Sequence, residues 1–145
     1  MVFMNDAEIR MLTEEPNLVR AAHAVMAMGP SAVVAKQGEY GAALFTSEGF
    51  FALPAYPLET VADPTGAGDS FAGGFLGYLA AHDPANPDDE LLRRAMAYGT
   101  ALASFNVEEF GTERVQRLTP EEITERVAAL QGFTTFADAP LTLRA

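Results

Sequence analysis

The sequence is organised around a glycine-rich loop that joins an extended segment to an apolar helix, within the stretch VADPTGAGDSFAGGFLGYLA at positions 61–80. Gly66 and Gly68 permit backbone conformations in which successive N–H groups point at one spot. The helix that follows adds its free N-terminal N–H donors and the positive end of its dipole. Phosphate is the anion that such an arrangement serves best. The loop therefore predicts an anion hole formed by Gly66, Ala67 and Gly68.

Asp69 stands directly after this loop, where a carboxylate repels the anion that the loop attracts. The repulsion makes sense if Asp69 takes a proton from a hydroxyl group whose oxygen attacks phosphorus. A plainer interpretation is a helix cap, because aspartate is a favoured N-cap residue. A dinucleotide-binding fingerprint, G-x-G-x-x-G, would need glycine at the position that Phe71 holds.

The run DPTGAGDSFAGGF, from Asp63 to Phe75, resembles the second signature of the PfkB (ribokinase-like) family of sugar and nucleoside kinases. The resemblance implies that Gly66, Ala67 and Gly68 form the anion hole and that Asp69 is the catalytic base. It also implies the reaction, which is transfer of the ATP γ-phosphate to a hydroxyl group of a sugar or nucleoside. The implied cofactors are ATP and Mg²⁺, and the implied partner is a small-molecule acceptor.

Asn5 and Glu8 form an N-x-x-E pair directly after a short apolar segment. One interpretation is a helix cap, with Asn5 at the N-cap position and Glu8 reaching back from the third helical position. The PfkB resemblance gives the pair a second interpretation, because an N-x-x-E motif upstream of G-A-G-D is linked to Mg²⁺ and phosphate handling. Oxygen ligands acting through water suit a hard ion such as Mg²⁺. The two interpretations are compatible.

Lys36 is the only lysine in the chain, and it lies two residues before Gly38 in a G-x-x-G turn that ends at Gly41. In the PfkB family a strand that ends in such a turn borders the nucleotide. The resemblance therefore makes Lys36, Gly38 and Gly41 nucleotide-binding candidates, with Lys36 contacting the ATP phosphates. The alternative for Lys36 is an exposed lysine at the end of a strand.

Asp63 and Thr65 precede the anion loop, and the segment 103–111, ASFNVEEFG, lies beyond the next predicted helix. This segment resembles the region where kinases of this family complete a site for a monovalent cation. Asp63 and Thr65 would supply the other half of that site. The resemblance leaves open a requirement for a cation such as K⁺.

The composition excludes several other classes of protein. A net charge of −11 argues against a nucleic-acid partner, since such a surface needs a basic footprint. No apolar run approaches the roughly 20 residues of a membrane span, and the first residues do not resemble a signal peptide. The absence of cysteine fits a cytoplasmic enzyme.

Alternating strand and helix patterns predict an α/β fold. Strands are expected at 32–36, 42–46 and 50–53, with the last two forming a hairpin, and Val2 to Met4 read as the end of a buried strand. Asp88 and Thr119 are expected to cap helices, while 131–145 read as an irregular tail. Gly73 and Gly77 are expected to let a neighbouring element approach the helix that follows the loop, and the three glycines at 73, 74 and 77 suggest close packing there. The resemblance makes this fold the ribokinase-like three-layer α/β/α arrangement with a mainly parallel sheet.

The resemblance extends from Val2 to Leu130 and corresponds to the C-terminal half of the family domain. We therefore expect residues 1–145 to be the nucleotide and catalytic-loop part of a kinase domain, without its N-terminal lid and acceptor-binding half. Such a fragment is expected to be inactive alone. Two alternatives remain open, a non-catalytic nucleotide-binding half-domain and a silent remnant. The expected assembly is a homo-oligomer or a complex with the missing half.

Overall fold

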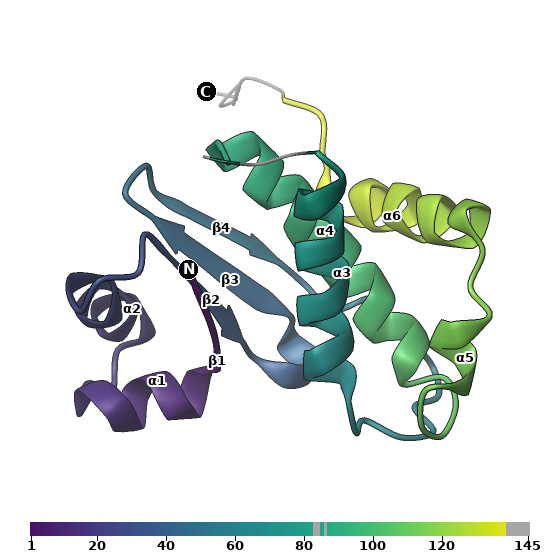
Figure 1. The fold of residues 1–145 in the computed structure, drawn as a ribbon, viewed down its shortest axis with the longest axis horizontal. Coiled ribbons are helices and arrows are strands. Elements are labelled where there is room, and N and C mark those ends of the chain that lie inside the picture. Colours follow the sequence, from purple (N-terminus) through teal and green to yellow (C-terminus); the bar gives the residue numbers. More distant parts are fainter. Residues whose placement is uncertain (83–84, 86, 139–145) are drawn as a thin grey trace, which may run out of the picture.

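A four-stranded sheet forms the centre of the computed structural model, which describes residues 1–82, 85 and 87–138 (Figure 1). The strands lie side by side in the order in which they occur along the chain. They are β1 (Val2–Asn5), β2 (Ala32–Lys36), β3 (Ala42–Thr46) and β4 (Phe50–Leu53). β1 pairs with β2 in parallel, whereas the β2–β3 and β3–β4 pairs are antiparallel.

Helices cover both faces of this sheet, as Figure 1 shows. One face carries α1 (Asp6–Thr13) and α2 (Leu18–Ala27), and the other carries α3 (Ala67–Ala81) and α4 (Asp89–Asn106). A short 3₁₀ turn (Gly38–Tyr40) follows β2, while α5 (Glu113–Gln116) and α6 (Pro120–Thr134) pack against α4. The predicted three-layer α/β/α fold is confirmed.

The two hydrophobic cores follow from the alternation of side chains along the central strands. Val33 and Ala35 of β2 face α1 and α2, whereas Ala32 and Val34 face α3 and α4. Successive residues of a strand point to opposite faces, so a strand covered on both sides is apolar throughout. By the same alternation Lys36 falls on the α3 side, which places its side chain near the glycine loop.

The sheet of this chain is mixed, whereas the family resemblance implies a mainly parallel one. Only the β1–β2 pair has a long helical crossover, which parallel neighbours require. β2, β3 and β4 are joined by short turns at 37–41 and 47–49, and short connections make antiparallel pairs. The hairpin predicted for 42–53 therefore accounts for the difference.

The contact between α3 and α4 is close because two glycines face each other's helices. A Cβ at Gly74 would lie 2.8 Å from the Tyr98 carbonyl oxygen, and one at Gly99 would lie 2.8 Å from that of Phe71. The expectation that Gly73 and Gly77 occupy this contact is wrong, since both positions face open space. Of the three glycines at which close packing is expected, Gly74 is the one that faces α4.

The predicted caps are present, and they fix where the later helices begin. The Asp88 carboxylate accepts the Leu91 N–H at 2.7 Å, and Thr119 with Glu122 forms a capping box at the start of α6. The tail expected from 131 is wrong in its first part, because α6 continues to Thr134, and 139–145 lie outside the described residues. Over the described part of the chain, no helix has the length and apolar character needed to cross a membrane.

Candidate active site

Three separate parts of the sequence meet at the carboxyl ends of β1 and β2. Asn5 is the last residue of β1 and pairs with Lys36, the last residue of β2. The N-terminus of α3 lies above the same edge, because Lys36 extends to Gly68 on its first turn. Crevices outside the carboxyl ends of strands are where open α/β sheets bind their ligands.

Of the two loop glycines, Gly66 has a left-handed conformation and Gly68 does not, and the Ala67 N–H donates to the Pro64 carbonyl at 3.2 Å. Gly66 has φ +82°, which is a left-handed conformation, and α3 starts at the next residue. The Ser70 N–H makes the first helical bond, to the Gly66 carbonyl at 2.9 Å. Within residues 1–82, 85 and 87–138, the N–H groups of Gly68 and Asp69 have no protein acceptor. These donors are available to an anion.

Lys36 supplies a positive charge directly beside these donors. A Cβ at Gly68 would lie only 2.7 Å from the Lys36 Nζ, so the ammonium group and the loop are in contact distance. Lys36 is half-buried, which excludes the alternative of a freely exposed strand-end lysine. The missing side chain at Gly68 is therefore what leaves room for the ammonium group above the loop.

Asp69 lies on the first turn of α3 with its side chain exposed. It does not cap the helix, since Gly66 holds the N-cap position without a side-chain bond. The residue lies on the same first turn as the free N–H groups, and it is exposed. The plainer interpretation of Asp69 as an N-cap is wrong.

Asn5 and Glu8 form a complete capping box at the start of α1. The Asn5 Oδ1 accepts the Ala7 N–H, and the Glu8 Oε2 accepts the Asn5 N–H, each at 2.8 Å. The capping interpretation is therefore present in the structure. Glu8 is exposed, and it bonds to Asn5, the residue that pairs with Lys36. Across the described part of the chain, no three acidic or histidine side chains converge in a metal-binding group.

Gly38 and Gly41 belong to the turn that follows Lys36. The Gln37 N–H donates to the Gly41 carbonyl at 2.8 Å, which closes the turn. Gly41 has φ +102° and lies against β4, where a Cβ would be 2.1 Å from the Leu53 carbonyl oxygen. Gly41 therefore has a structural reason to be glycine, and so does Gly38, which has φ +58° although a Cβ there would meet nothing within 4 Å.

Asp63 and Thr65 lie next to the segment 103–111, as the sequence predicts. The Val107 carbonyl accepts the N–H groups of Ala62 and Asp63, at 2.8 and 3.4 Å. Hydrogen bonds from Thr65, first from its backbone N–H at 2.9 Å, lower the pKa of the Asp63 carboxyl below its ordinary value. Asp63 is thus held as a carboxylate, the form that a cation would bind.

Asn106 is a residue near this site that the sequence reasoning missed. It is buried at the C-terminal end of α4 and bonds to both Thr65 and Ser70. One signal could have found it. A single asparagine in an otherwise apolar and small-residue stretch of helix needs a buried polar partner, and the neighbouring loop offers one.

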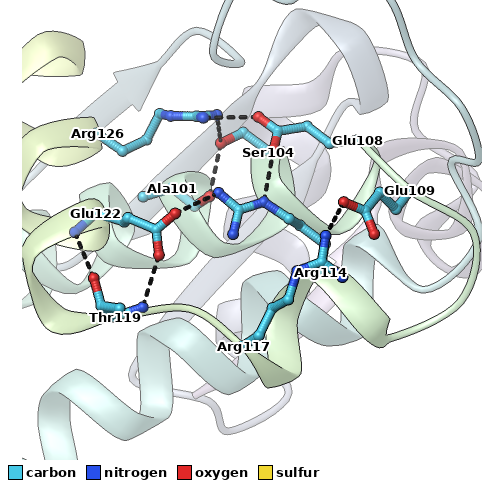
Figure 2. Close-up of polar contacts among 9 residues, drawn as sticks. All are labelled: Ala101, Ser104, Glu108, Glu109, Arg114, Arg117, Thr119, Glu122 and Arg126. Atoms are coloured by element: carbon cyan, nitrogen blue, oxygen red, sulfur yellow. Dashed lines mark hydrogen bonds and ion pairs between the residues drawn. The ribbon is translucent and has the colours of Figure 1, made fainter.

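A cluster of charged residues fastens α5 and α6 to the end of α4 that carries Asn106 (Figure 2). Glu108 accepts from Arg114 at 3.1 Å and from Arg126 at 2.7 Å, and both guanidinium groups stack on the Phe105 ring. Hydrogen bonds from the Thr119 N–H and from Arg114 lower the pKa of Glu122. Because these charges pair with one another, we assign the cluster to packing.

The glycine loop, the lysine beside it and the exposed carboxylate lie at one edge of an α/β domain. The family model for the pfkB family of carbohydrate kinases matches residues 1–117. The chain therefore belongs to the pfkB family, as the signature at 63–75 predicts.

Relatives in sequence are similar over part of their length. The chain is 37% identical to a cytidine kinase of Thermococcus kodakarensis, over 64% of this chain and 33% of the relative. It is 38% identical to a nucleoside kinase of Methanothermobacter thermautotrophicus, over 63% of this chain and 26% of the relative. The chain thus matches about a third or less of each of these kinases.

Solved structures confirm the ribokinase-like fold. Aminoimidazole riboside kinase from Salmonella enterica superposes with a TM-score of 0.71 at 29% identity, over 87% of this chain and 41% of that one. Ribokinase from Thermotoga maritima gives a TM-score of 0.70 at 25% identity, with the same coverage.

Proposed function

We propose that this chain provides the phosphate-binding and general-base part of an ATP-dependent kinase that phosphorylates a hydroxyl group of a sugar or nucleoside. The observation that carries the proposal is the contact of Lys36 Nζ with Gly68, directly beside the exposed Asp69. It brings a positive charge, free N–H donors and a carboxylate to one place. Membership of the pfkB family supports the same chemistry.

Each group has a distinct role in the proposed reaction. The N–H groups of Gly68 and Asp69, at the N-terminus of α3, bind the transferred phosphoryl group as its charge spreads over the outer oxygens. Lys36 neutralises charge on the ATP phosphates. Asp69 takes the proton of the acceptor hydroxyl while the new O–P bond forms and the bond to the ADP oxygen breaks.

Mg²⁺ fits the chemistry of Asn5 and Glu8 without a rigid protein cage. Both side chains carry oxygen atoms, and Glu8 is exposed with its second carboxylate oxygen unused by the capping box. Mg²⁺ usually keeps several waters and few protein ligands. When bound, it would offset phosphate charge, and Asn5 and Glu8 would orient its waters. Asp63 and Thr65, with the 107–111 loop, are the proposed place of a monovalent cation.

The acceptor class follows the named relatives, which are a cytidine kinase, nucleoside kinases and fructokinases. We propose a nucleoside or sugar, bound by residues outside the part of the domain that this chain matches. We propose that the chain works as a homo-oligomer or together with the N-terminal half of the domain. An alternative function is a nucleotide-binding half-domain without turnover.

Binding of Mg·ATP to the chain tests the shared part of both functions. We expect Lys36→Gln to weaken Mg·ATP binding by about tenfold or more, since a charge-assisted hydrogen bond contributes about 1.5–3 kcal/mol. Isothermal titration gives both affinities. Arg93→Gln is the matched loss of charge. Arg93 lies near the N-terminal end of α4, away from the loop, so this variant should leave the affinity unchanged. Equal weakening by both variants would reduce Lys36 to a general electrostatic effect.

Glu8→Gln separates the metal role of Glu8 from its capping role. Glutamine keeps the capping bond, because either Glu or Gln serves at the third helical position. The variant loses only the charge. We expect an unchanged melting temperature and a several-fold higher Mg²⁺ concentration for half-maximal ATP binding. A lower melting temperature with unaltered Mg²⁺ dependence would leave Glu8 with capping alone.

A further inference from the structure

Asn106 is a buried polar residue whose side chain contacts the glycine loop and not its own helix. It is 1% exposed, at the last position of α4. Elsewhere on α4 the buried residues are apolar or small, or hydroxyl-bearing side chains such as Ser104, which bonds within the helix. Burying an amide is unfavourable unless both of its ends find partners.

Both ends of the Asn106 amide form hydrogen bonds to residues that flank the loop, one on each side of Gly66. Its Nδ2 donates to the Thr65 carbonyl at 2.8 Å, and its Oδ1 accepts from the Ser70 hydroxyl at 2.8 Å. A carbonyl can only accept, so the bond to Thr65 fixes which way round the amide lies. One side chain therefore joins the residue before the loop to the first turn of α3.

The amide also lies against the loop glycine itself. A Cβ at Gly66 would be 3.5 Å from the Asn106 Oδ1, which is ordinary contact distance. Gly66 holds the left-handed conformation that turns the chain into α3, and glycine reaches other conformations at little cost. Something outside the loop must therefore select this conformation. Asn106 is the side chain placed to do so.

The position of Asn106 is itself fixed by contacts between its neighbours in sequence and α6. Ser104 and Glu108 on either side of it bond to Arg126 of α6, at 2.9 and 2.7 Å (Figure 2). Arg114 and Arg126 cover the adjacent Phe105 ring, with guanidinium carbons 4.7 and 3.9 Å from its centroid. The charged cluster thus holds the end of α4 as a rigid base for the amide.

We propose that Asn106 is a positioning residue for phosphate binding. By clamping Thr65 and Ser70 together, its amide holds Gly66 in the left-handed conformation and keeps the N–H groups of Gly68 and Asp69 aimed at one ligand. It does not touch the ligand. This inference rests on the proposed function, because it assumes that the loop binds a phosphate group.

Asn106→Asp is the sharpest test. The substitution keeps the shape and the acceptor for Ser70, but an ionised carboxylate cannot donate to the Thr65 carbonyl. We expect the backbone amide signals of Gly66, Ala67 and Gly68 in ¹H–¹⁵N spectra to shift or broaden without ligand. We also expect Mg·ATP to bind about tenfold more weakly or worse. Signals from the strands should stay in place.

Thr46→Val is the matched control. It removes a hydroxyl that donates to Asp89 at 2.8 Å and accepts the Glu48 N–H at 3.2 Å, at the end of the sheet away from the site. This variant should lose stability without changing the loop signals or the affinity. Ser70→Ala removes only the bond to Oδ1, so it decides the matter if Asn106→Asp does not fold, with an expected loss of about threefold in affinity.

The outcomes separate this inference from the function on which it rests. If the wild-type chain binds Mg·ATP and a folded Asn106→Asp variant binds it equally well with unshifted loop signals, the positioning role is wrong while the proposed function stands. If the wild-type chain does not bind Mg·ATP, the proposed function fails. The signals of Gly66 to Gly68 without ligand then still decide whether Asn106 sets the loop conformation.

Discussion

Replacing Asp69 by asparagine is expected to lower the rate of phosphoryl transfer by about 10²–10⁴-fold, the usual contribution of general-base catalysis. Asparagine has nearly the same shape but cannot accept the proton of the acceptor hydroxyl. The side chain is exposed on the first turn of α3 and does not cap the helix, so the substitution should not affect folding. Steady-state kinetics of the complete kinase domain, with a panel of nucleosides and sugars, measure the loss.

The same variant should bind Mg·ATP as well as the wild type, or slightly better. Asp69 places a negative charge beside the N–H groups that receive the phosphates, and the substitution removes that repulsion. Asp88→Asn is the matched control. Asp88 is the N-cap of α4, a position where Asp and Asn serve equally well. An Asp69→Asn enzyme that keeps half of the wild-type rate would remove Asp69 from the mechanism.

Parts of the site that are continuous in sequence could be predicted from sequence alone. The position of the turn at 66–68 follows from its own glycines and from the helix directly after it. The caps at Asn5, Asp88 and Thr119 depend on residues within three positions. The hairpin at 42–53 has short apolar strands joined by a polar turn. In each case the residues that decide where the turn, cap or hairpin lies are close together in the sequence.

Contacts between distant segments could not be predicted in the same way. The approach of Lys36 to Gly68 depends on the register of β1 with β2 and on how α3 crosses the sheet. The Asn106 amide meets Thr65 only because α4 packs closely on α3 through Gly74 and Gly99. The sequence suggested close packing at 73, 74 and 77, but it did not show that Gly74 alone of the three faces α4. The family resemblance supplied part of this missing information, since it placed Asn5, Lys36 and Asp69 in one site.

Gly41→Ala is expected to destabilise the chain by about 3 kcal/mol or more, because strain from an unfavourable conformation and overpacking each cost about 1–3 kcal/mol. Gly41 has φ +102°, a backbone conformation that residues other than glycine rarely adopt. Its Cβ would lie 2.1 Å from the Leu53 carbonyl oxygen and 2.7 Å from the Ala55 nitrogen. Both are backbone atoms, so neither can rotate away. The turn after Lys36 would have to open.

Thermal unfolding measures this effect, and Gly77→Ala provides the control. About 1 kcal/mol shifts the melting temperature of a chain of this size by about 2–4 °C, so Gly41→Ala should lower it by about 10 °C. Gly77 lies within α3 and a Cβ there would meet nothing within 4 Å. Alanine should therefore stabilise α3 by up to about 1 kcal/mol. An unchanged melting temperature for Gly41→Ala would mean that β4 does not press on this turn. The need for glycine at position 41 would then have to come from nucleotide binding, and Gly41→Ala should lower the Mg·ATP affinity without lowering the melting temperature.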